Sequence, residues 1–242
     1  PWPPPHLARA RELWDEWGAW YRGDREELAT YYRARHGAGM PAPRPSQYRG
    51  GIVGAVARMW WGTPPSPGQA PARLHIPIPA DLAATSADLL WGEPPEITLD
   101  TERTRARWAE IADEGDLITR LHEAGELAAA YGGAYLRIGW DTEIAGVPLV
   151  DAIRPDCAVP EWRLGRLSAV TFWRQLDGDD DGREVWRHLE RHEGGRIEHG
   201  LYRGTAERLG RRVDLGAHPE TAPPAGLVGA EGAIGTGARA TA

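Results

Sequence analysis

Apolar residues between positions 75 and 95 recur at helical spacing, with proline and glycine at both ends of the run. Pro79 suits a first helical turn, because its missing N–H would have had no partner there. Asp81 places a negative charge near the positive end of the helix dipole. Gly92 then ends the run. The pattern predicts a helix over residues 80–91.

The side chains of this helix predict that it is buried and packed on several sides. Its larger residues and one serine share a face, namely Leu82, Ser86, Leu89 and Leu90. Small residues, mainly alanine, occupy the rest of its surface, so neighbouring elements can approach closely. A Leu89→Ala change should then cost about 2–5 kcal/mol, as expected for a buried leucine.

Two amphipathic helices are predicted at the start of the chain. The first covers residues 7–21 and gathers its aromatic side chains on one stripe. Asp24 and Glu27 form a capping-box pattern for a second helix, which stops at Gly37. Aromatic and arginine residues alternate here and could stack bases, but the acidic residues among them would repel phosphate. We favour helices that dock on their own protein or on a neighbouring subunit.

Residues 38–73 are rich in glycine, proline and serine and show no clear period, which indicates a linker or an irregular wrap. Residues 52–61 within this region are apolar. Such a segment is seldom left in water, so we expect it to lie against another surface.

The next part of the chain predicts more helices. Residues 96–99 alternate as a short strand, and Asp100 and Asp116 can each cap a helix. Gly132 and Gly133 can end the second of these helices.

Alternating strands follow, and Leu136, Ile138 and Trp140 point to one side of the first. The predicted strands cover 135–140, 149–153, 167–176, 185–193 and 196–202, the last two forming a hairpin across Gly194 and Gly195. Helices followed by antiparallel strands indicate an α+β fold rather than a doubly wound α/β fold. We expect a helical arm, a linker, an α+β domain and a flexible tail at residues 1–37, 38–73, 74–218 and 219–242.

Composition and charge exclude several kinds of chemistry. The net charge of −7 excludes a generally basic nucleic-acid binder. All 28 positively charged residues are arginine, so there is no lysine for a Walker A loop, a Schiff base or a general base. Cys157 is the only cysteine, which excludes an intramolecular disulfide and a cysteine-based zinc site. No apolar run reaches membrane-spanning length.

Two patterns resemble metal sites. Residues 177–182 reproduce the first half of an EF-hand calcium loop, but the twelfth position is His188 instead of glutamate and strands flank the loop. A solvated hairpin turn explains it better. His188, Glu190 and His192 share one face of a predicted strand and could meet a metal. A solvated polar face is the commoner meaning, so we predict no catalytic residue, cofactor or metal ligand.

Tryptophan is unusually frequent, with twelve residues against one phenylalanine. Trp140, Trp162 and Trp173 lie in or beside predicted strands and are expected in the core. The N-terminal third holds more aromatic side chains than one core could bury, and tryptophan is enriched at protein interfaces. The candidate oligomer-interface residues are Trp14, Trp17, Trp20, Tyr21, Trp60 and Trp61.

The chain resembles the portal proteins of tailed bacteriophages, in particular the siphovirus type from phages of GC-rich actinobacteria. Four stretches carry the resemblance: Ile76-Pro-Ile-Pro79 through Trp91-Gly-Glu-Pro-Pro95, Gly132-Gly-Ala-Tyr-Leu-Arg-Ile-Gly-Trp140-Asp, Pro155-Asp-Cys-Ala-Val-Pro-Glu-Trp162 through Trp173, and Val185-Trp-Arg-His-Leu-Glu-Arg-His192 through Thr205. Together they cover much of the chain, and the combined pattern is more specific than any one piece.

The resemblance implies a homo-oligomeric ring, usually of twelve subunits, at one vertex of the capsid in the virion. Such rings are assembled in the host bacterial cytoplasm, contact the major capsid protein and dock the large terminase subunit. They pass double-stranded DNA without sequence specificity and receive the head–tail connector. Family chains are about twice this length, so we expect this to be the N-terminal half, with the outward-facing wing. The family has no catalytic residues to carry over.

Two other functions stay open. One is a metal-dependent enzyme that uses the face of His188 and His192. The other is a different capsid-associated adaptor module.

Overall fold

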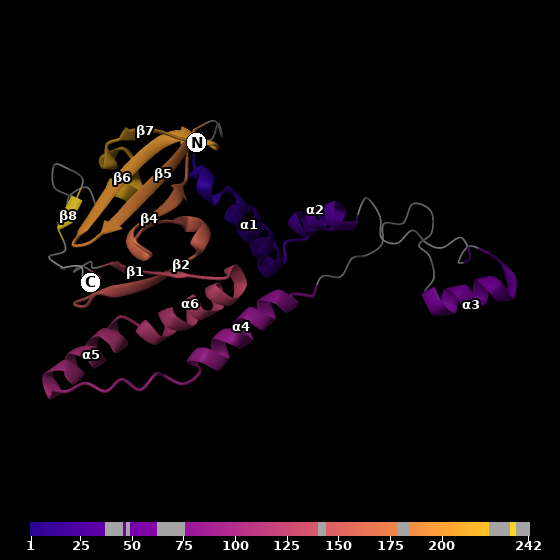
Figure 1. Ribbon diagram of the computed structural model, residues 1–242, viewed down its shortest axis with the longest axis horizontal. Coiled ribbons are helices and arrows are strands. Elements are labelled where there is room, and N and C mark those ends of the chain that lie inside the picture. The colour runs from indigo at the N-terminus through magenta and orange to yellow at the C-terminus, as the bar shows by residue number, and fades with distance from the viewer. Residues whose placement is uncertain are drawn as a thin grey trace. The chain divides into compact units, whose positions relative to one another are not determined.

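Helices precede antiparallel strands along the chain, so the predicted α+β fold is confirmed (Figure 1). The computed structural model describes residues 1–36, 46, 49–61, 76–139, 144–178, 184–222 and 233–235. The chain divides into two compact units, residues 1–15 with 82–242 and residues 16–81.

The larger unit contains an antiparallel sheet with the strand order β3-β4-β5-β6-β7, in which β8 also pairs with β6. The strands are β3 (Ala158–Arg163), β4 (Arg166–Leu176), β5 (Val185–Glu193), β6 (Arg196–Thr205), β7 (Arg208–Val213) and β8 (Ala233–Gly235). The predicted hairpin across Gly194 and Gly195 joins β5 to β6, with Glu193 opposite Arg196.

A separate two-stranded hairpin packs on this sheet. It consists of β1 (Tyr135–Gly139) and β2 (Leu149–Ile153), which pair as predicted. Tyr135 and Ile153 pack against the buried cluster of Ala158, Val170 and Phe172 on the sheet. The opposite side of β1 is more open, since Leu136 is 49 % exposed and Ile138 61 % exposed. The hairpin therefore covers the core with the face of β1 that carries Tyr135, and the face that carries Leu136 and Ile138 is the more exposed one.

The helices α5 (Glu102–Glu114) and α6 (Leu117–Tyr131) lie before the hairpin in the chain, and α6 contacts β2. Neither predicted capping residue acts as a cap. Thr101, not Asp100, caps α5, because its hydroxyl accepts the Thr104 N–H at 3.2 Å. Asp116 has a left-handed backbone, and its side chain accepts no capping hydrogen bond.

The predicted end of α6 is confirmed, since Gly132 adopts a left-handed conformation there with φ 76°. The predicted strand at 96–99 is wrong, because these residues form a loop. Four alternating residues make a strand only where another strand offers its hydrogen-bonding edge.

The helix predicted at 80–91 is present as α4 (Ile78–Trp91), but its leucine face is not buried. Leu82 is 63 % exposed, Leu89 84 % and Leu90 67 %. The buried side chains are instead Ala83 and Ala87. The prediction of burial on several sides is therefore wrong.

The reason is a close approach between α4 and α6. A Cβ added at Gly125 of α6 would lie 2.8 Å from the Trp91 indole Nε1 and 3.7 Å from the Ala87 Cα. Helices this close leave room only for small side chains, so the alanine face packs and the leucines point away. Asp88 and His122 add a 2.8 Å contact across the same pair of helices.

Leu89→Ala is therefore expected to change the free energy of unfolding by less than about 0.5 kcal/mol, as for other exposed positions. Ala87→Leu is the matched control, and overpacking the α4–α6 contact should cost about 1–3 kcal/mol. Urea denaturation of both variants measures the two values. A loss of about 2 kcal/mol or more in Leu89→Ala, the cost of a buried leucine, would place that side chain in a core.

The second unit contains α2 (Arg25–His36), α3 (Gly51–Trp61) and the last part of α1 (Ala8–Arg22). Asp24 caps α2 as predicted, because its carboxylate accepts the N–H groups of Glu26 and Glu27 at 2.9 Å each. Trp20 of α1 packs edge-on against Tyr32 of α2, with 5.2 Å between ring centroids.

Candidate functional site

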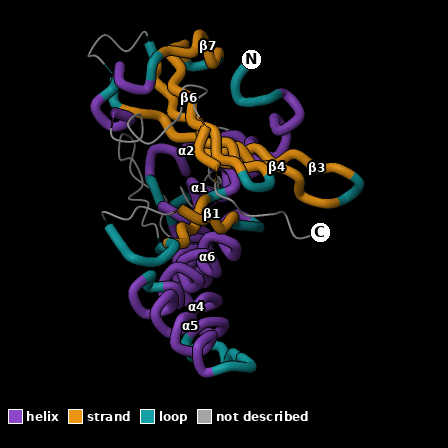
Figure 2. The backbone as a smooth tube through the Cα atoms, turned by 90° about the vertical axis from the view of Figure 1, so that its left-hand side faces the viewer, coloured by secondary structure: helices purple, strands orange, loops and turns teal. Residues whose placement is uncertain are grey.

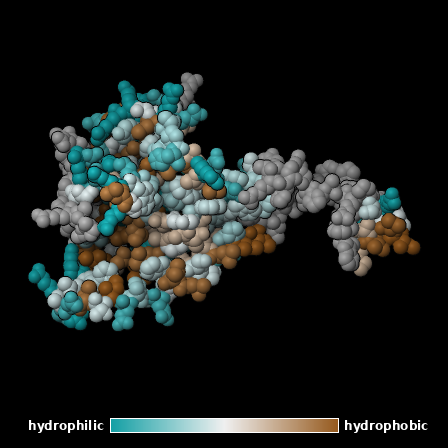
Figure 3. Space-filling view, viewed as in Figure 1, coloured by the Kyte–Doolittle hydropathy of each residue, from teal (hydrophilic) through white to brown (hydrophobic). Residues whose placement is uncertain are grey.

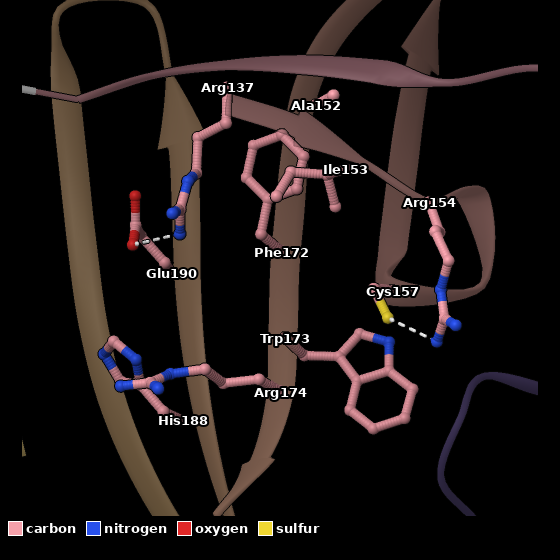
Figure 4. A pocket seen from close by; sticks show the side chains of 10 residues that line it. All are labelled: Arg137, Ala152, Ile153, Arg154, Cys157, Phe172, Trp173, Arg174, His188 and Glu190. Atoms are coloured by element: carbon pink, nitrogen blue, oxygen red, sulfur yellow. Dashed lines mark hydrogen bonds and ion pairs between the residues drawn. The ribbon is translucent and has the colours of Figure 1, made fainter. Parts of the chain in front are cut away.

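A cavity of about 270 Å³ lies between the β1–β2 hairpin and the large sheet (Figure 4). Its lining residues are Arg137, Ala152, Ile153, Arg154, Cys157, Phe172, Trp173, Arg174, His188 and Glu190. The lining combines three arginines, a histidine, a carboxylate and the only thiol of the chain, so the cavity is the leading candidate for a catalytic or binding site.

Glu190 is the centre of a polar network in this cavity. Arg137 donates to it at 3.2 Å and also to Asp151 at 2.5 Å, and His192 Nε2 lies 2.5 Å from its other oxygen. Burial alone would raise the pKa of Glu190, but the hydrogen bond from His192 and the charge of Arg137 outweigh burial and lower the pKa to about 2. Glu190 is therefore ionised, and each of its carboxylate oxygens has a hydrogen-bond partner.

His188 and His199 form a stacked pair on the neighbouring strands β5 and β6. Their rings are 5.3 Å apart at an interplanar angle of 7°, and Nε2 of His188 lies 3.2 Å from Nδ1 of His199. Burial, followed by the adjacent His199, lowers the pKa of His188 to about 4. Burial also lowers the pKa of His199. Both rings are therefore neutral near pH 7, and one donates to the other.

The structure brings the three residues of the metal hypothesis onto one face, as the strand period predicts, but it gives them other partners. His192 binds Glu190, and His188 binds His199. Within the described ranges, no group of three or more histidine, cysteine, aspartate or glutamate residues is arranged to hold a metal ion. The calcium-loop pattern falls largely on residues 179–183, which lie outside the described part of the chain.

Cys157 is not set up as a nucleophile. Burial and the neighbouring Asp156 raise its pKa, so the thiol stays protonated at neutral pH. Its sulfur accepts a long hydrogen bond of 3.8 Å from Arg154. The three arginines of the cavity are also neutralised, since their carboxylate partners are Asp151 and Glu190 for Arg137, Asp156 for Arg154 and Glu220 for Arg174.

The charges of the cavity are therefore paired, its buried His188 is neutral near pH 7 and its thiol is protonated. Trp173, predicted in the core, lies at its edge and packs against Trp2 at 5.7 Å. Trp162, also predicted in the core, is 63 % exposed near the β3–β4 turn, so that prediction is wrong. Trp140 lies outside the described residues.

The predicted interface residues of α1 are partly exposed. Trp17 is 37 % exposed, while Trp14, Trp20 and Tyr21 have intermediate exposure. The buried residues of α1 are Gly18 and Ala19. The side chains of Trp60 and Trp61 lie outside the described part of the structure. The role of all six residues at an interface stays a prediction.

The sequence missed a second apolar surface. The leucine face of α4 was assigned to the core, although it is exposed. An exposed leucine also stands at the β3–β4 turn, where Leu164 is 97 % exposed with φ 52°. Figure 2 shows this hairpin projecting from the sheet, and β4 pairs with β5 only from Ala169 onward. The repeated alanines of α4 are the sequence feature that could have revealed the exposed leucine face, because small residues mark the closely packed face of a helix.

No protein-family model matches the chain, and no curated protein is significantly similar to it. Among the helices that the structure describes, none combines the length and apolar character needed to cross a bilayer.

Proposed function

We propose that the protein is a subunit of a tailed-bacteriophage portal, the ring at the capsid vertex through which DNA is packaged and ejected. The four sequence stretches that resemble portal proteins support this proposal. They fall on α4, on the turn from α6 into β1, on β3 with β4, and on the β5–β6 hairpin. They thus cover some of the elements of the α+β unit, and α5, α6, β2 and β7 lie outside them.

The observation that carries the proposal is the amount of apolar surface left open on separate elements. Large exposed side chains occur on α3 and α4 (Figure 3). A closed ring needs a heterologous interface with two different patches on each subunit. A chain with distinct apolar patches is therefore better suited to such an assembly than to remaining a monomer.

Electrostatics is consistent with a DNA conduit. The net charge is −7, and a channel that lets DNA slide should not bind phosphate tightly. The proposed partners are the major capsid protein, the large terminase subunit and the head–tail connector, and the proposed location is the virion.

Electron microscopy of the complete gene product tests the proposal directly. Negative-stain images should show closed rings with a central opening. A large-terminase gene and a major capsid gene beside its own gene are expected as well. A product that stays monomeric at all concentrations and lacks these neighbouring genes would falsify the portal function. A monomer that binds capsid would instead indicate the adaptor module.

The aromatic stripe of α1 is expected to help join subunits. Changing Trp14, Trp17 and Trp20 together to alanine should reduce ring yield at least about tenfold, because buried aromatic anchors dominate interface energies. Trp162→Ala, which removes an exposed tryptophan elsewhere, is the matched control and should leave the yield unchanged. Sedimentation velocity measures the ring fraction. Normal ring yield in the triple variant would exclude α1 from the subunit contact.

A further inference from the structure

Helix α3 exposes nearly all of its large aliphatic side chains. Ile52 is 83 % exposed, Val53 57 %, Val56 59 % and Met59 86 %. Ile52, Val56 and Met59 follow at spacings of four and three residues, so they form one stripe along the helix. Ala57, in contrast, is buried. The large apolar side chains of α3 therefore face outward, while its buried positions carry small residues.

Helix α4 has the same arrangement. Its alanines face α6, while Ile78, Leu82 and Leu89 lie on the opposite side at 54–84 % exposure. These three residues, with Thr85, follow the four-three-four spacing of a coiled-coil seam. Brown surface marks both helices in Figure 3. An exposed seam of this kind accepts another helix.

The α3 stripe is shorter than the α4 stripe. Ile52 and Met59 are seven residues apart, about 10 Å at the helical rise per residue, which equals the separation of Leu82 and Leu89 on α4. Ile78 extends the α4 stripe by four more residues. Between Leu82 and Leu89 lie the small side chains of Thr85 and Ser86, which leave space for a larger side chain such as that of Val56.

The charges of the two helices are opposite. Arg58 is the only charged residue of α3, whereas α4 carries two acidic residues, Asp81 and Asp88, of which Asp88 also contacts His122 of α6. Pairing α3 with α4 brings unlike charges near one another, whereas α3–α3 or α4–α4 pairing brings like charges together. Charge therefore favours the mixed pair.

We propose that the α3 stripe of one chain docks on the α4 stripe of a second copy of the chain. The choice of a second copy rests on the proposed ring, because α3 and α4 are two different patches, as a heterologous interface requires. Each subunit then offers α3 to one neighbour and α4 to the other. The contact is a helix-in-groove interaction between identical chains.

Charged substitutions on α4 test whether the stripe is needed. The double variant Leu82→Glu, Leu89→Glu should raise the apparent Kd of self-association at least about tenfold, since two buried leucines each contribute roughly that much or more. Leu164→Glu, which alters a still more exposed leucine at the β3–β4 turn, is the control and should leave the Kd unchanged. Both changes are at exposed positions, so circular dichroism should show intact folds.

Cysteine crosslinking tests whether the contact joins two chains. In a Cys157→Ala background, chains carrying only Val56→Cys are mixed with chains carrying only Ser86→Cys and oxidised. A covalent heterodimer is the expected product, and a mixture of Val56→Cys with Leu164→Cys should give none. A disulfide that forms only when Val56→Cys and Ser86→Cys share one chain would show intrachain docking and overturn the proposal, as would no disulfide at all.

These outcomes distinguish a failure of the proposed α3–α4 interface from a failure of the proposed portal function. Rings that persist in the Leu82→Glu, Leu89→Glu variant would overturn the α3–α4 contact and leave the portal function standing. A heterodimer from a parent protein that never forms rings would support the contact and remove the portal function.

Discussion

Phe172→Ala is expected to lower the free energy of unfolding by about 3–5 kcal/mol, the usual cost of removing a buried phenylalanine. Phe172 is only 6 % exposed and lies in the cluster that joins the large sheet to the β1–β2 hairpin. Its ring packs edge-on against Tyr135 at 6.3 Å and His192 at 5.3 Å. Removing the ring leaves a cavity between Tyr135 and His192.

Urea denaturation followed by circular dichroism measures this effect. Phe172→Leu should lose less, because leucine keeps most of the buried apolar area and gives up mainly the aromatic contacts, worth about 0.5–1.5 kcal/mol. Trp162→Ala is the control, since that ring is 63 % exposed on the neighbouring strand. Equal stability of Phe172→Ala and Trp162→Ala would mean that the hairpin does not close the core.

Acidification below pH 6.5 is expected to destabilise the protein through His188. The ring is 7 % exposed, and its pKa is lowered to about 4 in the folded chain from an ordinary value of 6.5. Between these values the unfolded chain binds a proton that the folded chain rejects. The stabilising contribution is therefore complete above pH 6.5 and declines as the pH falls towards 4, by at most about 3 kcal/mol.

Glu190 extends the decline to lower pH. Its pKa is lowered from 4.5 to about 2 in the folded chain, so its stabilisation is present above pH 4.5 and is lost between pH 4.5 and 2. Together the two groups predict a continuous loss of stability from pH 6.5 downward.

Unfolding free energies measured across this pH range test the assignment. His188→Asn should flatten the curve between pH 6.5 and 4 and leave the lower part intact. His6→Asn, which removes an exposed histidine, is the matched control and should not flatten it. A parent protein equally stable at pH 7 and pH 4.5 would contradict a buried neutral His188.

Local sequence determined most of the elements. The helical and alternating periods located α4, α6 and the strands β1, β2, β4, β5 and β6, because side chains must repeat every 3.6 or two residues to share a face. Gly132 and Asp24 marked a helix end and a helix start through backbone effects that act within one turn.

The buried polar network was only partly visible. The strand period placed His188, Glu190 and His192 on one face. The strand period could not predict the hydrogen-bond partners Arg137 of β1 and His199 of β6, because the folding of other segments against β5 brings them to this face. Those partners join the face into a hydrogen-bonded network with β1 and β6.

The sequence by itself determined the α+β order, the acidic charge and the excess of apolar and aromatic surface. Only the tertiary structure decided which face of α4 packs. An alanine face and a leucine face are both apolar, so periodicity alone cannot show which of them is buried. The larger apolar area of leucine favours the prediction that the leucine face is buried. Gly125 and Trp91 brought α6 so close that only alanine fits, which left Leu82 and Leu89 for another surface.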